Sequence, residues 1–302
     1  MTRPLARYAL LALGIAGLSA AGVFYKLSAA PVVAIVAYRM LIASLLTAPL
    51  ALARGAIAPR QGRAPFGRSD LAVSAAAGAF FAIDILLWAS SLRFTSVASA
   101  SLFVSTDPIF VAVFAWLLFR ERPTGVLVAG IGVGIAGMVV VAGNDFRVAG
   151  HAAIGDGIAL LASLLESGYL LVGRHVRQRV DALRYTLVLY TSCTLVLWLI
   201  VLATRSPATL QPHDLLIALA LAVVATLLGH TIVSQSLGHL PAAVVAASFL
   251  AQPMLAALFA LWFIRQPIPL ATVVGGLIAL AGIGIVAYAN ERRGLDTSTQ
   301  AV

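Results

Sequence analysis

Four ionisable side chains lie deep inside apolar stretches of this chain, where a membrane protein keeps such groups for chemistry. They are Asp84, Asp107, Glu166 and His230. A charge near the bilayer centre costs roughly 2.5–3.5 kcal/mol on insertion scales, so these groups usually face a cavity or a partner. An acid can hold a substrate amine or a proton, and a histidine can titrate near neutral pH.

Aromatic residues accompany two of these acids at helical spacing. Asp84 and Trp88 are four residues apart, and Glu166 and Tyr169 are three apart. Residues at these spacings share one face of a helix. Each acid is therefore predicted to have an aromatic wall beside it, as a site for a small organic solute would.

Structural roles for the same groups stay open. Asp84 could have a purely structural role, in which it pairs with His230 or with Arg39 and tethers two helices. Arg39 lies at shallower depth in another apolar run. Glu166 could pair with Arg39 or with the region of Arg174. The substrate and ion pathway predicted from the sequence also includes Asp107 and Gln252, so it comprises Asp84, Trp88, Glu166, Tyr169, His230, Asp107, Gln252 and Arg39.

Two prolines follow polar residues at corresponding places, as Asp107-Pro108 and Gln252-Pro253. Proline removes a backbone donor and frees an upstream carbonyl, which kinks a helix. The hydroxyls of Ser105–Thr106 can satisfy the freed groups locally. Paired kinks predict a gated cavity, and a static bend around a crossing helix is the alternative.

The elements that must position these residues are ten apolar runs. The chain has 302 residues, of which 61% are hydrophobic and 10% charged, whereas soluble proteins are about 25% charged. Each run is long enough to cross a bilayer as a helix. The runs cover residues 7–25, 32–52, 71–92, 97–119, 124–142, 154–173, 184–203, 215–237, 242–264 and 270–289.

An internal repeat with a shift of 145 residues divides these runs into five and five. Ser91-Leu92 falls on Ser236-Leu237, and Phe114-Ala115 on Phe259-Ala260, without a gap. Units with an odd number of spans insert in opposite directions and build a site at the midplane. We therefore predict an all-α integral membrane protein with ten transmembrane helices as two inverted five-helix repeats. The repeats are 1–145 and 150–290, and a disordered cytoplasmic tail covers 291–302.

Basic residues predict the orientation. Placing the N-terminus in the cytoplasm puts fourteen of the twenty Lys and Arg residues inside and five outside. Both termini are then cytoplasmic, in a bacterial-type inner membrane. The net charge of +9 is explained by this topology, since no basic helix or aromatic-interleaved patch suits nucleic acid.

Small residues recur in the fifth and tenth runs. Their spacing lets helices approach closely, either inside a monomer, which we favour, or at a homodimer seam. They are Gly130, Gly134 and Gly137 in one run, and Gly275, Ala279 and Gly282 in the other.

Motifs for most enzyme classes are missing from the sequence. It has no Walker loop and no Gly-x-Ser-x-Gly, His-Glu-x-x-His or Cys-x-x-Cys pattern, and its one cysteine is Cys193. We expect no ATP motor, no cofactor, no metal and no enzymatic activity. Proton coupling and uniport both remain open.

Two stretches resemble the drug/metabolite transporter superfamily in its EamA branch. Residues 92–143 carry a proline-containing helix, a Glu-bearing turn and a glycine-rich helix, and residues 227–267 carry the matching part of the second repeat. Gln252 and Gln266 stand where the family often has acids, so proton coupling in this chain would need another acid.

The resemblance implies a secondary, non-ATP transporter that exports small organic metabolites, such as amino acids or amines, by alternating access. The export direction is implied by the resemblance to the family alone, and no residue of the sequence indicates it. Two rivals from other classes remain: a membrane-embedded enzyme acting on a lipid head group, and a channel or scaffold.

Overall fold

The computed structural model of the chain is built of helices throughout the residues it describes. These are residues 2–57, 67–107, 109–110, 113–114, 117, 124–148, 150–177, 182–236, 248–249 and 251–299. The helices are α1 (Thr2–Leu27), α2 (Val32–Ile57), α3 (Arg68–Ser91), α4 (Val97–Val104), α6 (Gly125–Val148), α7 (Ala152–Arg177), α8 (Ala182–Ala203), α9 (Pro212–Ala220), η1 (Leu221–Thr231), α10 (Ile232–Ser236), α12 (Gln252–Ile264) and α13 (Leu270–Thr299).

Six of the described helical segments are long and apolar enough to cross a membrane. They are Ala6–Leu27, Val32–Ala53, Arg68–Ser91, Gly125–Asn144, Leu183–Ala203 and Pro212–Thr231. Large apolar side chains point outward from the bundle, with Leu52, Leu202, Trp262 and Phe263 each 70% exposed. A surface of this kind suits lipid rather than water.

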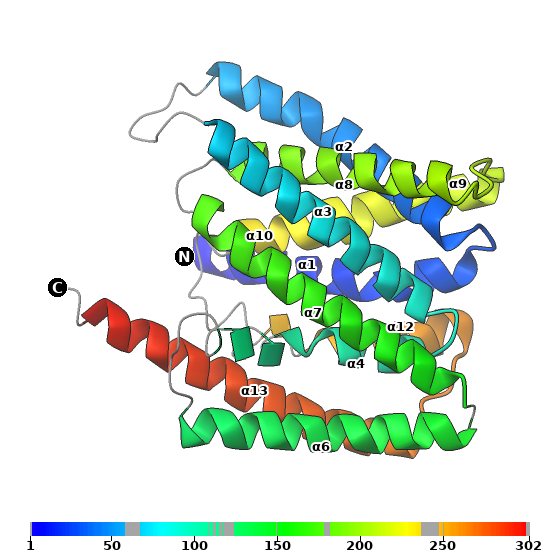
Figure 1. Cartoon of the computed structure of the whole chain (residues 1–302), viewed down its shortest axis with the longest axis vertical. Coiled ribbons are helices and arrows are strands. Elements are labelled where there is room, and N and C mark those ends of the chain that lie inside the picture. Colours follow the sequence, from blue (N-terminus) through cyan, green and yellow to red (C-terminus); the bar gives the residue numbers. More distant parts are fainter. Residues whose placement is uncertain are drawn as a thin grey trace.

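The helices run back and forth between two ends of the molecule (Figure 1). α1 begins and α13 finishes at the same end. The connections 28–31, 92–96, 204–211 and 265–269 gather at the opposite end, which we call the connector end.

Helix contacts occur in pairs that the 145-residue shift exchanges. α3 packs against α7, and their counterparts η1 and α1 also pack together. The shift maps the contact of α2 with α8 onto itself, because these two helices are each other's counterparts. The same holds for the contact of α6 with α13. The internal repeat is thus visible in the packing as well as in the sequence.

α6 and α13 meet along a glycine seam, formed by Gly130, Gly134, Gly137, Gly275, Ala279 and Gly282. A Cβ added to Gly137 would fall against the backbone of Ala279 and Gly275, and one added to Gly282 against the backbone of Gly134. At Gly137 and Gly282 only glycine allows this approach, and the other seam positions are also small. The predicted packing role inside one chain is confirmed.

Pro253 marks the start of a described helix, and its role as a kink or gate stays a prediction, since residues 237–247 and 250 before it lie outside the described part. Pro253 lies in the first turn of α12, whose N-cap is Ala251. A proline is tolerated there because a first-turn N–H has no intrahelical partner. In the other half α4 ends at Val104, next to Pro108, which lies outside the described residues. The run expected as one helix over 97–119 therefore has a break instead.

Two further predicted elements differ from the structure. The run at 215–237 is not α-helical throughout, because its middle, η1, is a π-helix of 11 residues. α13 continues to Thr299, into the segment expected as a disordered tail. That segment lacks proline and begins with the helix formers Glu291, Arg292 and Arg293, so the helix has no local reason to stop at the apolar limit.

Candidate functional site

Three acids predicted to carry chemistry come together from three helical regions. Asp84 lies on α3, Asp107 follows α4, and Glu166 lies on α7. Asp84 interacts electrostatically with Asp107, and Glu166 interacts with both. Asp84 is 4% exposed, while Asp107 and Glu166 are half-buried. The structure thus gathers carboxyl groups that are far apart in the sequence.

A buried arginine lies beside these acids. Arg39, on α2, is 2% exposed and interacts electrostatically with Asp84. Its Nε donates to Thr226 Oγ1 at 2.9 Å, and its Nη1 donates to the Tyr25 hydroxyl at 3.0 Å. The guanidinium carbon also lies 5.8 Å from the centroid of the Tyr25 ring. Arg39 is therefore oriented by neutral groups, and we call Asp84, Asp107, Glu166 and Arg39 the charge cluster.

The tethering alternatives lack the ion pairs that they require. Within the described part of the chain, no salt bridge within 4.0 Å joins Asp84 to Arg39 or to His230, nor Glu166 to Arg39. The side chain of Arg174 lies outside that part. Buried charges usually have a close partner. The Asp84 pairs and the Glu166–Arg39 pair therefore do not form as salt bridges in the described part, and the pairing of Glu166 with the region of Arg174 stays a prediction.

The π-helix η1 positions the polar residues of the eighth run. Thr226 Oγ1, which accepts from Arg39, donates to the carbonyl of Leu221 five residues earlier, at 3.3 Å. η1 approaches α1 so closely that a Cβ at Gly17 would lie 2.6 Å from the Val224 oxygen. π-helical turns are frequent at functional sites because they redirect side chains that an α-helix would place elsewhere.

His230, on η1, contacts an aromatic ring rather than an acid. Its ring packs edge-on against Phe81 of α3, with 5.4 Å between the ring centroids. His230 is half-buried. The structure therefore places it against the helix that carries Asp84, without a bond to that acid.

An aromatic wall stands beside the charge cluster, as predicted for Trp88. The Trp88 ring packs edge-on against Tyr25 of α1 at 5.8 Å between centroids. Trp88 is 8% exposed, and its Nε1 donor is buried without a hydrogen-bond partner. An unsatisfied buried N–H is uncommon, and its site usually receives a water or a ligand.

The polypeptide near Asp107 is held by hydroxyl groups. Ser105 Oγ donates to the Ser101 carbonyl at 2.8 Å, and Thr106 Oγ1 to the Phe103 carbonyl at 2.7 Å. Ser167 Oγ, on α7, donates to the Asp107 carbonyl at 3.1 Å. These bonds satisfy carbonyls around the break after α4, and none of them goes to the carbonyl of Val104, four residues before Pro108.

Other predicted residues lie at the margin of the described site or outside it. Gln252 is half-buried in the first turn of α12, and no hydrogen bond of its side chain is seen in the described part. Tyr169 lies on α7, but its side chain is outside that part. Tyr25 and Thr226 were missed from the sequence, because nothing local marks a residue whose role is to orient a distant arginine.

The sequence matches a model of a known protein family along most of its length. The sequence model of the EamA-like transporter family matches residues 6–143 and, a second time, residues 153–288. The chain belongs to the EamA-like transporter family. It is accordingly a multi-pass membrane protein and a membrane transporter.

Two relatives illustrate the similarity. An uncharacterized transporter of Archaeoglobus fulgidus is 24% identical over 199 residues, covering 64% of this chain and 68% of that protein. A solved crystal structure shares the fold with a TM-score of 0.59 and 20% identity, covering 93% of this chain and 96% of the other.

Proposed function

We propose that this EamA-family protein exports small organic metabolites with a positively charged group, such as amino acids or amines, without ATP. The observation that carries this proposal is the charge cluster. Three carboxyl groups and one guanidinium interact there, yet no ion pair joins Asp84 or Glu166 to Arg39 in the described part of the chain. A transported cation or proton supplies the missing partner.

The charge balance favours such a partner. If all three acids were ionised, the cluster would carry a net negative charge inside the membrane, which is expensive without compensation. No three His, Cys, Asp or Glu side chains among the described residues are close enough to hold one metal ion. An organic ammonium group or a proton therefore fits these acids better than a metal does. Trp88 adds an aromatic wall and an unused donor.

Alternating access follows from a duplicated and inverted arrangement of five helices each. The exchange of helix contacts by the 145-residue shift supports it, and so do the two matches to the family model. The break after Val104 and the start of α12 at Gln252 lie near equivalent positions of the repeat, since Val104 corresponds to Phe249. We place both termini in the cytoplasm of a bacterial-type inner membrane, so the connector end faces outward.

The test of this proposal is flux into liposomes. Purified protein should exchange a labelled amino acid or amine saturably and without chemical change. Asp84→Asn and Glu166→Gln should each lower the rate at least about a hundredfold, since each removes a charge that the solute or the proton needs. Asp70→Asn on the same helix as Asp84 is the matched control, because asparagine keeps the bond to the Gly67 N–H.

Several results would refute the proposal or its parts. Normal flux in both single variants would remove the charge cluster from the pathway. Chemical conversion of the solute would favour a lipid-head-group enzyme, and unsaturable flux a channel. If flux did not respond to a pH gradient, proton coupling would be refuted and the protein would be a uniporter. In a Gly150→Cys variant, labelling of the N-terminus and of the new thiol from the same side of the membrane would refute the inverted repeat.

A further inference from the structure

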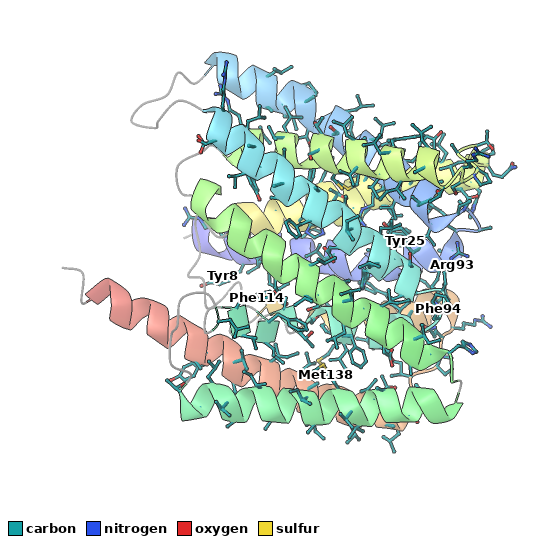
Figure 2. The ribbon with its side chains drawn as sticks, in the orientation of Figure 1. Tyr8, Tyr25, Arg93, Phe94, Phe114 and Met138 are labelled. Carbon is teal, nitrogen blue, oxygen red and sulfur yellow. The ribbon has the colours of Figure 1, made fainter. Side chains whose placement is uncertain are left out.

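A pocket lies at the connector end, apart from the acids of the charge cluster. Its volume is about 230 Å³, and it opens between α1, α2 and α3 and their connections. Its walls are mostly apolar, and two cationic side chains lie on it. The residues that matter are Lys26, Arg93, Tyr25, Val32, Ile35 and Leu92. Figure 2 shows Tyr25 and Arg93 close to each other at this end of the molecule.

The two cations are held in place by backbone oxygens. Lys26 Nζ donates to the Thr95 carbonyl at 3.0 Å, and Arg93 Nη2 donates to the Ala30 carbonyl at 2.6 Å. These carbonyls fix the side chains but carry no net charge. Lys26 and Arg93 also repel each other electrostatically. Like charges held together on one pocket are unfavourable unless an anion lies between them.

No carboxylate of the described chain supplies that anion through a salt bridge. The two acids near these connections are engaged by hydroxyl groups: Asp214 Oδ1 accepts from Ser28 Oγ at 2.7 Å, and Asp156 Oδ1 accepts from Thr95 Oγ1 at 2.7 Å. Three Lys26 donors and five Arg93 donors exceed the single carbonyl that each side chain contacts. Both cations therefore retain hydrogen-bonding capacity for a ligand.

The geometry points to a binding site for a small organic carboxylate in this pocket. The carboxylate lies between Lys26 and Arg93, since Arg accepts a carboxylate through two parallel bonds and Lys adds a point charge. The apolar body of the ligand packs on Val32, Ile35 and Leu92. This site is additional to the proposed transport function and stands or falls separately from it.

Tyr25 connects the pocket to the charge cluster. Tyr25 lines the pocket, while its hydroxyl accepts from Arg39 and its ring packs edge-to-face with Trp88. A carboxylate bound at the connector end is thus separated from the buried arginine by a single side chain.

Ligand pairs on the unmodified protein give the primary test. The thermal unfolding midpoint of the full chain in detergent is followed against 4-methylpentanoate, 4-methylpentanamide and leucinamide. We expect saturable stabilisation by 4-methylpentanoate and none by 4-methylpentanamide, because the amide keeps the apolar body and lacks the anion. Leucinamide is a cation of the kind proposed for the charge cluster, so any stabilisation by it should be lost in Asp84→Asn and kept when Lys26 and Arg93 are changed to glutamine. Equal stabilisation by 4-methylpentanamide, or none by 4-methylpentanoate, overturns the assignment. This comparison needs no variant, so it holds even where a substitution fails to fold.

Variants then locate the site. Lys26→Gln with Arg93→Gln should raise the half-saturating concentration of 4-methylpentanoate at least about tenfold, as expected when charge-assisted bonds are lost. Arg205→Gln is the matched control, since Arg205 is an exposed cation at the same end and does not line the pocket, and it should change nothing. Unchanged affinity in the double variant overturns the proposal.

A third variant separates this site from the proposed function. Asp84→Asn should retain 4-methylpentanoate binding even where it abolishes flux. Loss of binding in Asp84→Asn together with normal binding in the double variant would place the carboxylate in the charge cluster and overturn the pocket assignment. If 4-methylpentanoate binds but neither the unmodified protein nor any variant supports flux, the pocket assignment is kept and the transport proposal is refuted.

Discussion

The glycine seam and the charge cluster use the internal repeat in opposite ways. In the seam, the contacts themselves repeat: Gly137 lies against Gly275, Gly130 lies against Gly282, and the 145-residue shift exchanges these two contacts. In the charge cluster no acid has an acidic counterpart. The shift places Gly229 at Asp84 and Gln252 at Asp107.

Glu166 follows the same rule, since its counterpart is Ala21. Symmetry therefore serves packing in the seam, where two like surfaces can be complementary. Asymmetry applies to the acids, since three like charges on each side would repel, whereas Arg39 has a basic counterpart in Arg184. A mutation in the seam should act on folding, and one in the cluster should act on transport more than on folding. The predictions below test that division.

The largest effect is expected in the seam, from Gly137→Leu. The new side chain would meet the backbone of Ala279 and Gly275, and backbone cannot move aside as a flexible side chain can. Overpacking should destabilise the protein by at least about 3 kcal/mol. The measurement is the yield and thermal unfolding midpoint of purified protein in detergent.

Gly132→Leu on the same helix is the matched control. No atom lies within 4 Å of a Cβ built at Gly132, so this leucine would extend into open space. Similar yields and midpoints for both variants would show that the seam carries little of the stability.

A smaller loss of stability is expected from Arg39→Met. Methionine keeps an unbranched chain but removes both donors, to Thr226 and to Tyr25, and leaves the acids without a cation. Because these hydrogen bonds come from a charged group, we expect the free energy of unfolding to fall by about 2–3 kcal/mol. Liposome flux should also be lost. Arg205→Met, an exposed cation, should show neither effect. Full flux with Arg39→Met would exclude this residue from the mechanism.

Thr226→Val isolates one contact of that arginine. Valine keeps the shape but removes the hydroxyl that accepts from Arg39 Nε and donates to the Leu221 carbonyl. We expect a loss of about 1–2 kcal/mol, read as a lower unfolding midpoint, with flux reduced but present. Thr226→Ser keeps the hydroxyl and should restore most of both. Failure of serine to do so would assign the effect to packing in η1.

Much of the fold could be predicted because its signals are local or periodic. Apolar runs of bilayer length mark the spans, and α3 at Arg68–Ser91 lies within a few residues of its predicted range. The glycine spacing predicted the seam, since a stripe of small residues has few uses besides close packing. The acids were found because charge is rare in such runs.

The site geometry could not be predicted to the same extent, because it depends on contacts between distant segments. Arg39 and Thr226 are 187 residues apart, and nothing local to either predicts the bond. η1 contains residues that an α-helix would also accept, so its π-helical register depends on packing against α1. Pro253 lies in a first helical turn, and its pattern in the sequence does not distinguish such a turn from a kink.

The smallest expected effect comes from Ser167→Ala. Ser167 Oγ donates to the Asp107 carbonyl at 3.1 Å across two helical regions and to the Ser163 carbonyl at 2.9 Å within α7. Losing the first bond should cost about 0.5–1 kcal/mol and leave one carbonyl beside the break after α4 less well satisfied. Ser90→Ala is the control, because Ser90 Oγ donates only to Leu86 of its own helix, at 2.6 Å. A lower unfolding midpoint for Ser167→Ala than for Ser90→Ala would measure what the contact between helices adds. Equal midpoints with a change in flux restricted to Ser167→Ala would show that this hydroxyl positions Asp107 for transport without stabilising the fold, which is the division of roles that separates the cluster from the seam.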